Sequence, residues 1–291
     1  MTESELIKML QDDPMNLENY DALADWYEEN GDDEKAVKVL KDALENVEMG
    51  RVEMDEASKN SYVTSYYLDI ASLLGGLSRF SESNKYLDLA MNYNLSDEGL
   101  HQLYCYRANN FYHSYIIEEK SFEESEFVQA CEWAQKGIDL SPDEVGKLYM
   151  YELLSQMYVE LNDTKKTEEY ANKTVKLTAK IKKEDPEAVD EYFAYVPYSY
   201  AAECYFNVED IPNAIRLLLE CESAGNQYDA DETFMYSTYT SLGQCYSFEG
   251  AHNLALAYFE KAQAIDADDA QLQEWITKLK EIIEVDEDSQ N

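Results

Sequence analysis

Acidic side chains dominate the chemistry that this sequence could perform. The 291 residues carry 61 Asp and Glu against 23 Lys and Arg, which gives a formal net charge of −38. Asp21, Asp25 and Glu28 recur at i, i+4 and i+7, a spacing that places three carboxylates on one face of a helix. Such a row can attract Lys or Arg of a partner, while the charge repels nucleic-acid backbones and anionic membranes. We therefore predict neither nucleic-acid nor membrane binding.

No residue pattern predicts catalysis. His101, His113 and His252 are dispersed, and the sequence holds no glycine-rich phosphate loop and no nucleophile elbow. The five cysteines form no C-x-x-C pair, and Cys204 and Cys245 occupy equivalent positions in two repeated segments, which favours buried packing. We predict a protein that is not an enzyme, with no catalytic, cofactor-binding or metal site and no cofactor.

The sequence also predicts a cytoplasmic location. Its first ten residues, MTESELIKML, lack the basic and apolar regions of a secretory signal. No run of about 18 apolar residues could span a membrane. Unpaired cysteines suit a reducing compartment.

Composition and an internal repeat indicate the elements that must position these side chains. Hydrophobic residues make up 45% of the chain, and only 10 Gly and 5 Pro punctuate it, which favours helices around a real core. A small residue recurs in the expected second helix of a helical hairpin, at positions 36, 83, 130, 167, 214 and 255. A single hairpin cannot bury its apolar face, so the hairpins must stack.

Two segments show the repeat most clearly. The later one has Tyr239, Leu242, Gly243 and Tyr246, followed by Ala255, Phe259 and Ala262; the earlier one has Tyr20, Leu23, Ala24 and Tyr27, followed by Gly31, Ala36, Leu40 and Ala43. Both resemble the tetratricopeptide repeat, with Tyr in place of the family's Trp. The resemblance implies an all-α protein, an α-solenoid wound as a right-handed superhelix of about six hairpins. Repeat steps of about 40–47 residues would also suit HEAT or armadillo hairpins.

Both ends are expected to cap the stack. Thr2 and Glu5 are spaced as a capping box that opens a short helix. A terminal amphipathic helix is predicted to turn six apolar residues inward: Leu272, Trp275, Ile276, Leu279, Ile282 and Ile283. We predict a single domain over residues 1–285 and an acidic tail at 286–291.

The resemblance further implies that first helices line a concave groove. The groove residues would be Asp21, Asp25, Glu28, Ser65, Asn109, Tyr112, Tyr149, Glu152, Gln156, Glu203, Phe206 and Gln244. Tyr112, Tyr149 and Tyr195 are expected to face away from their hairpin partners. Family members that bind chaperone tails place Lys, Arg and Asn in the groove to clamp a terminal carboxylate. Acids stand here instead, so that activity is not carried over.

These features predict an interaction scaffold that binds a polar or basic peptide segment, or a protein partner, in its groove. Amide and tyrosine side chains would hold the segment by hydrogen bonds. The alternative is an acidic inhibitor or immunity-type protein whose surface mimics an anionic ligand and blocks a basic enzyme. The oligomeric state is left open.

Overall fold

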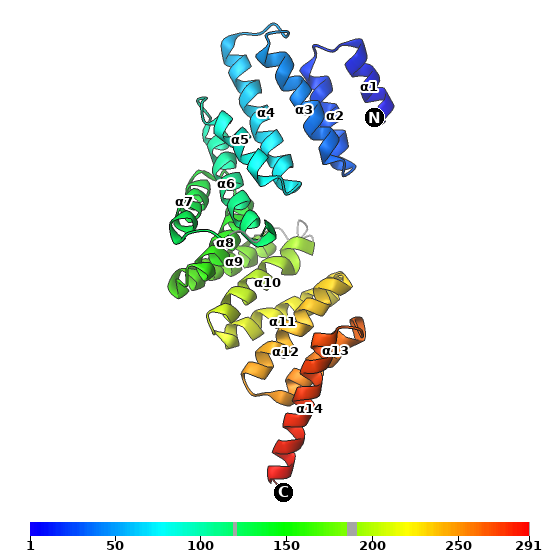
Figure 1. Cartoon of the computed structure of the whole chain (residues 1–291), viewed down its shortest axis with the longest axis vertical. Coiled ribbons are helices and arrows are strands. Elements are labelled where there is room, and N and C mark those ends of the chain that lie inside the picture. The colour runs from blue at the N-terminus through cyan, green and yellow to red at the C-terminus, as the bar shows by residue number, and fades with distance from the viewer. Residues whose placement is uncertain (119–120, 185–190, 291) are drawn as a thin grey trace. The chain divides into compact units, whose positions relative to one another are not determined.

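The computed structural model describes residues 1–118, 121–184 and 191–290, except for the side chains of 191–193 and 286–290. Within these residues the chain forms fourteen helices and no strand, so the predicted all-α solenoid is confirmed (Figure 1). The acidic tail predicted at 286–291 lies outside the described side chains.

The helices form six consecutive hairpins between two single end helices. The chain begins with α1 (Glu3–Asp12) and ends with α14 (Ala270–Gln290). The hairpins are α2 (Leu17–Glu29) with α3 (Asp33–Glu48), α4 (Glu56–Gly76) with α5 (Phe80–Ala90), α6 (Asp97–Glu118) with α7 (Glu124–Leu140), α8 (Glu144–Glu160) with α9 (Thr164–Glu184), α10 (Glu191–Asn207) with α11 (Ile211–Tyr228), and α12 (Glu232–Phe248) with α13 (His252–Ile265).

The chain divides into two compact units, Met1–Met150 and Tyr151–Asn291, and the boundary falls within α8. Each unit has its own buried apolar residues. The first unit is built around side chains such as Leu23, Ile70 and Leu103, and the second around side chains such as Leu217 and Leu242. A single domain over 1–285 stays a prediction.

The small residue of every second helix is buried within the solenoid. All six are completely buried, at 0% exposure: Ala36, Ser83, Ala130, Thr167, Ala214 and Ala255. Where the residue is polar, its hydroxyl is satisfied by a backbone carbonyl. Ser83 Oγ donates to the Ala71 carbonyl at 2.6 Å, and Thr167 Oγ1 donates to the Asp163 carbonyl at 3.1 Å. The repeat register predicted from these positions is therefore confirmed.

Glycine serves two purposes in the sixth hairpin. Gly250 has φ +73°, which allows the chain to leave α12 in the left-handed conformation, as Gly31 does after α2 at φ +72°. Gly243 instead permits close approach, because a Cβ there would lie 2.4 Å from the ring of Phe259 on α13. Both roles follow from the tight packing that the hairpin requires.

The end helices behave largely as predicted. At the start, Glu5 N–H donates to Thr2 Oγ1 at 3.4 Å and Thr2 N–H donates to Glu5 Oε2 at 2.9 Å, which confirms the capping box. At the other end, α14 buries three of its apolar residues, Leu272, Ile276 and Leu279, against the sixth hairpin.

The inward face predicted for α14 is wrong at Ile282, which is 42% exposed. The reason is length, because α14 has 21 residues while its neighbour α13 has 14. The second half of α14 therefore has less surface to pack against, as Figure 1 shows for the red helix.

This difference generates a matched test of the capping role of α14. Leu279→Ala deletes a side chain that is 5% exposed and should lower the free energy of unfolding by about 2–5 kcal/mol. Ile282→Ala removes an exposed side chain and should cost less than about 0.5 kcal/mol. Urea denaturation of both variants measures the two values. Equal costs would show that α14 does not cap the hairpin stack.

Candidate functional site: two pockets on first helices

The first unit contains a cavity of about 370 Å³ between α2 and α4, which we call the acidic pocket. Its lining is Asp21, Asp25, Glu28, Leu40, Tyr62, Ser65, Tyr66, Asp69, Ser72, Leu73 and Tyr106. The structure thus brings together Asp21, Asp25 and Glu28, the row predicted from spacing, with the predicted Ser65. Sequence reasoning missed Asp69, although it follows Ser65 by four residues and therefore shares its helix face.

The acidic pocket is electrostatically uncompensated, because none of its lining residues in the described part of the chain is Lys or Arg. Loss of hydration, together with the charges of Asp21 and Asp25, raises the pKa of Asp69 to about 6. The hydroxyl of Ser65 opposes this shift by donating to Asp69 Oδ2 at 3.1 Å. Loss of hydration and repulsion by Asp25 also raise the pKa values of Asp21 and Glu28.

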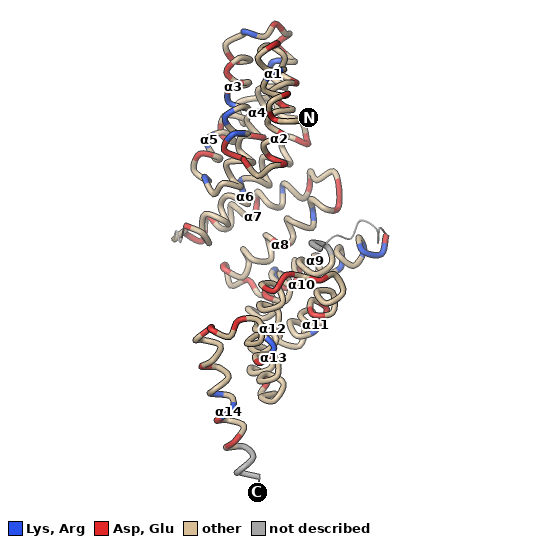
Figure 2. Tube along the Cα trace, turned by 90° about the vertical axis from the view of Figure 1, so that its right-hand side faces the viewer, with Lys and Arg blue, Asp and Glu red and all other residues tan. Residues whose placement is uncertain are grey.

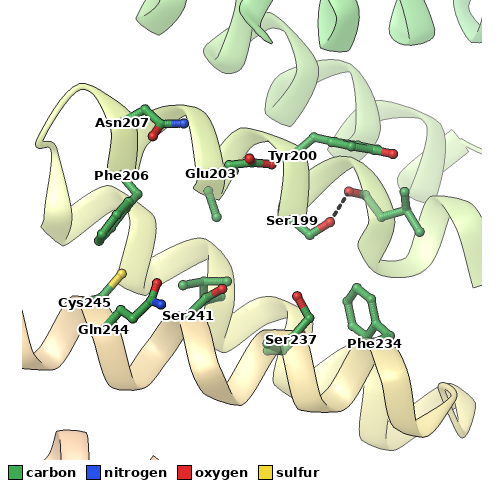
Figure 3. A pocket seen from close by; sticks show the side chains of 14 residues that line it. Ser199, Tyr200, Glu203, Phe206, Asn207, Phe234, Ser237, Ser241, Gln244 and Cys245 are labelled. Atoms are coloured by element: carbon green, nitrogen blue, oxygen red, sulfur yellow. Dashed lines mark hydrogen bonds between the residues drawn. The ribbon is translucent and has the colours of Figure 1, made fainter. Parts of the chain in front are cut away.

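The second unit contains a larger cavity of about 650 Å³, the α10–α12 pocket (Figure 3). Helix α10 contributes Ser199, Tyr200, Glu203, Phe206 and Asn207, and helix α12 contributes Phe234, Ser237, Ser241, Gln244 and Cys245. The predicted Glu203, Phe206 and Gln244 therefore line one pocket. Hydroxyl and amide groups supply most of its polar side chains, and Glu203 is its one carboxylate among the described lining residues. Loss of hydration raises the pKa of Glu203.

Other predicted groove residues lie outside these two pockets. Asn109 on α6 and Tyr149 on α8 contact each other within the first unit, where the Tyr149 hydroxyl donates to Asn109 Oδ1 at 2.7 Å. Tyr112, also on α6, lies with its ring centroid 6.4 Å from that of Tyr115. None of the three lines the acidic pocket or the α10–α12 pocket.

Two predicted residues of α8 are covered by protein. Glu152 is only 3% exposed. Burial of Tyr200 raises the pKa of that tyrosine, and the charge of Glu152 raises it further. Gln156 is half-buried. Tyr195 is expected to face away from its hairpin partner, α11. Its side chain is 4% exposed and packs against α12, with its ring centroid 4.1 Å from that of Phe234.

The scarce basic residues are held elsewhere, over tyrosine rings. In three repeats the lysine six positions after the small residue lies over the tyrosine that replaces the family's Trp. These pairs are Lys136 with Tyr104 at 5.3 Å, Lys173 with Tyr151 at 5.5 Å, and Lys261 with Tyr239 at 5.1 Å from the ring centroid. Such cation–π contacts stabilise the hairpins. Sequence reasoning missed this pattern, although the lysine recurs at a fixed offset.

The described residues contain no group of three or more His, Cys, Asp and Glu side chains arranged to hold a metal ion. This includes the carboxylates of the acidic pocket.

No helix in the described part of the chain combines the length and the apolar character needed to cross a membrane.

The family comparison agrees with this architecture. Residues 236–269, which cover most of α12 and all of α13, match the tetratricopeptide repeat. This segment of the chain is a tetratricopeptide repeat. No curated protein matches the sequence of the chain. The match confirms, for the sixth hairpin, the resemblance identified from Tyr239, Gly243 and Ala255.

Solved structures of low sequence identity share the tetratricopeptide-repeat fold. The hetero-tetramer Cut9–Hcn1 of the APC/C matches with a TM-score of 0.62 and 10% identity, over 96% of this chain and 46% of that chain. The S. pombe nuclear import adaptor Nro1 matches with a TM-score of 0.54 and 13% identity, over 95% of this chain and 99% of that chain. YrrB, described as a tetratricopeptide-repeat protein with an unusual peptide-binding site, matches with a TM-score of 0.50 and 15% identity, over 72% and 89%.

The raised pKa of Asp69 predicts a specific dependence of stability on pH. Its folded-state pKa of about 6 exceeds the ordinary value of 3.8, so the native state binds more protons in that interval. The carboxyl therefore contributes stability that is present below about pH 4 and lost as the pH rises through about 6.

Asp69→Asn removes this titration. We expect the variant to unfold with a higher free energy than the parent at neutral pH, and the gain to vanish near pH 4. The gain should stay below about 1 kcal/mol, because Asp69 is open to solvent that screens the repulsion. Thermal unfolding over this pH range measures the difference, with exposed Asp42→Asn on α3 as the control. A gain independent of pH would refute the assignment.

Proposed function

We propose that this chain is a non-catalytic interaction scaffold that binds a polar or basic peptide segment of a partner protein. The observation that carries the proposal is the composition of both pockets. Each is built mainly from first helices. The acidic pocket contains four carboxylates and the α10–α12 pocket contains one, and neither has Lys or Arg among its described lining residues. A basic segment would gain charge complementarity at either pocket, which speeds association and selects against acidic partners.

The α10–α12 pocket supplies the groups that an extended peptide requires. Its lining residues follow one another in the same order along the two helices, from Ser199 to Asn207 and from Phe234 to Cys245 (Figure 3). At about 1.5 Å rise per residue, the lined stretch of α10 is about 12 Å long, enough for about three extended residues. Asn207 and Gln244 each offer both an amide donor and an acceptor to a peptide backbone.

Neighbouring proteins of the same fold add support. YrrB is described as having a peptide-binding site, and Nro1 is described as an adaptor. The fold is shared at 15% and 13% identity, so the partner of this chain must be sought from its own pocket chemistry. We expect it to act in the cytoplasm.

A second candidate is the acidic inhibitor that mimics an anionic ligand. Acidic residues outnumber basic residues over most of the chain (Figure 2), and exposed acids also lie on second helices, such as Asp42, Glu132 and Glu220. A mimic would use the acids of the outer surface as well as those of the pockets. The two functions therefore differ in which carboxylates matter.

The test replaces the row on α2 with neutral isosteres, Asp21→Asn, Asp25→Asn and Glu28→Gln. The probe is a short peptide of alternating arginine and glycine, with a glutamate–glycine peptide as the acidic counterpart. We expect the triple variant to bind the basic peptide several-fold more slowly at low salt, because the attracting charges are lost. The difference should disappear at high salt, where the Debye length falls to about 3 Å. Stopped-flow fluorescence measures the association rate.

The matched control carries Asp42→Asn, Glu132→Gln and Glu220→Gln, which change the net charge by the same amount on second helices. A scaffold should tolerate these changes with little loss of association rate. If the control slows association as much as the α2 triple, the anion mimic is favoured over the scaffold. Unchanged association kinetics in the α2 triple would remove the acidic row from the binding site.

A further inference from the structure

The acidic pocket combines carboxylates with aromatic side chains, a chemistry that differs from the hydroxyls and amides of the α10–α12 pocket. We propose that the acidic pocket is a receptor for one arginine side chain of the partner segment, and that arginine entry displaces a proton from the pocket. The inference rests on the proposed scaffold function and names the residue that the first unit would select.

A buried polar group points to a missing ligand at this site. Tyr66 on α4 is 2% exposed and lines the pocket, yet its hydroxyl makes no hydrogen bond of normal distance and angle with the described residues. Asp21 still acts on this hydroxyl as a weak hydrogen-bond acceptor and through its charge, and the charge of Asp69 adds to it, which places the hydroxyl toward the carboxylates. A buried hydroxyl with so imperfect a partner is costly, and its oxygen can accept an N–H from a bound cation.

The shape and composition favour a guanidinium group over an ammonium group. Four carboxylates and the hydroxyls of Ser65 and Ser72 offer more acceptors than the three donors of a lysine can use. Arginine brings five donors in a planar fork, is more weakly hydrated, and stacks on aromatic rings. Tyr62 and Tyr66 both line the pocket, and their ring centroids lie 6.1 Å apart. A cavity of about 370 Å³ has room for one side chain.

Proton displacement follows from the charges around the pocket. The carboxyls of Asp21, Glu28 and Asp69 have raised pKa values. The titratable groups that face them are Glu18 and Asp25 on α2, Asp33 on α3, Tyr62 and Tyr66 on α4, and Tyr106 on α6, with Cys105 behind Tyr106. None of these groups is a cation. Near pH 6 the Asp69 carboxyl is partly protonated. A guanidinium that enters the pocket lowers the carboxyl pKa values, so Asp69 releases this proton to solvent.

The experiment titrates the full chain with three capped peptides in which glycines flank arginine, lysine or citrulline. Isothermal titration calorimetry near pH 6, in two buffers of different ionisation enthalpy, gives affinity and released protons together. We expect the arginine peptide to bind at least about threefold more tightly than the lysine peptide. The citrulline peptide should bind about tenfold or more weakly than the arginine peptide. Between zero and one proton should be released near pH 6, and none near pH 8.

Variants separate the pocket from the general charge of the chain. Asp69→Asn should abolish most of the proton release and weaken arginine binding at least about threefold, whereas Asp42→Asn, with the same charge change on exposed α3, should do neither. Any of three outcomes would overturn the inference. The citrulline peptide could bind as tightly as the arginine peptide, the arginine peptide could bind without proton release, or Asp69→Asn and Asp42→Asn could have equal effects on binding and proton release. Lysine binding equal to arginine would also overturn it while leaving the scaffold function intact, since a basic segment would still be bound.

Discussion

The whole architecture depends on one close contact in each hairpin, where a small residue of the second helix meets the first helix. Ala36, Ser83, Ala130, Thr167, Ala214 and Ala255 are all at 0% exposure. This contact fixes the rotation of the first helix about its axis and so decides which side chains it buries. On α10, Ala201 and Tyr205 are buried, whereas Ser199, Glu203 and Phe206 line a pocket. Packing geometry therefore determines where binding chemistry is displayed.

Charge is distributed according to the same geometry. The chain has 23 basic residues for 61 acids, and several of the lysines are committed to tyrosine rings at fixed offsets within their hairpins. Lys136, Lys173 and Lys261 stabilise the hairpins there. The acidic pocket has no Lys or Arg among its described lining residues, and loss of hydration together with the charges of Asp21 and Asp25 raises the pKa of Asp69.

The hairpin register could be predicted from sequence because it depends on local patterns, namely small residues, capping signals and helical spacing. Asp21, Asp25 and Glu28 could be placed on one helix face for the same reason, whereas Ser65 was assigned to the groove by the family resemblance. The prediction failed where tertiary packing decides, as at Ile282, which extends beyond the packing surface of α13. Asp69 and the lysine–tyrosine pairs were missed because their importance depends on groups from other helices.

The central claim is that the carboxylates lining the pockets, not the acidic surface as a whole, receive a basic partner. Carboxylate footprinting tests it most directly, by amide labelling of Asp and Glu with and without the arginine–glycine peptide and mass spectrometry of each site. The account predicts protection of Asp21, Asp25, Glu28, Asp69 and Glu203, with Asp42, Glu132 and Glu220 labelled as in the free protein. Uniform protection of pocket and outer carboxylates would contradict it and indicate an anionic surface that acts without a defined site.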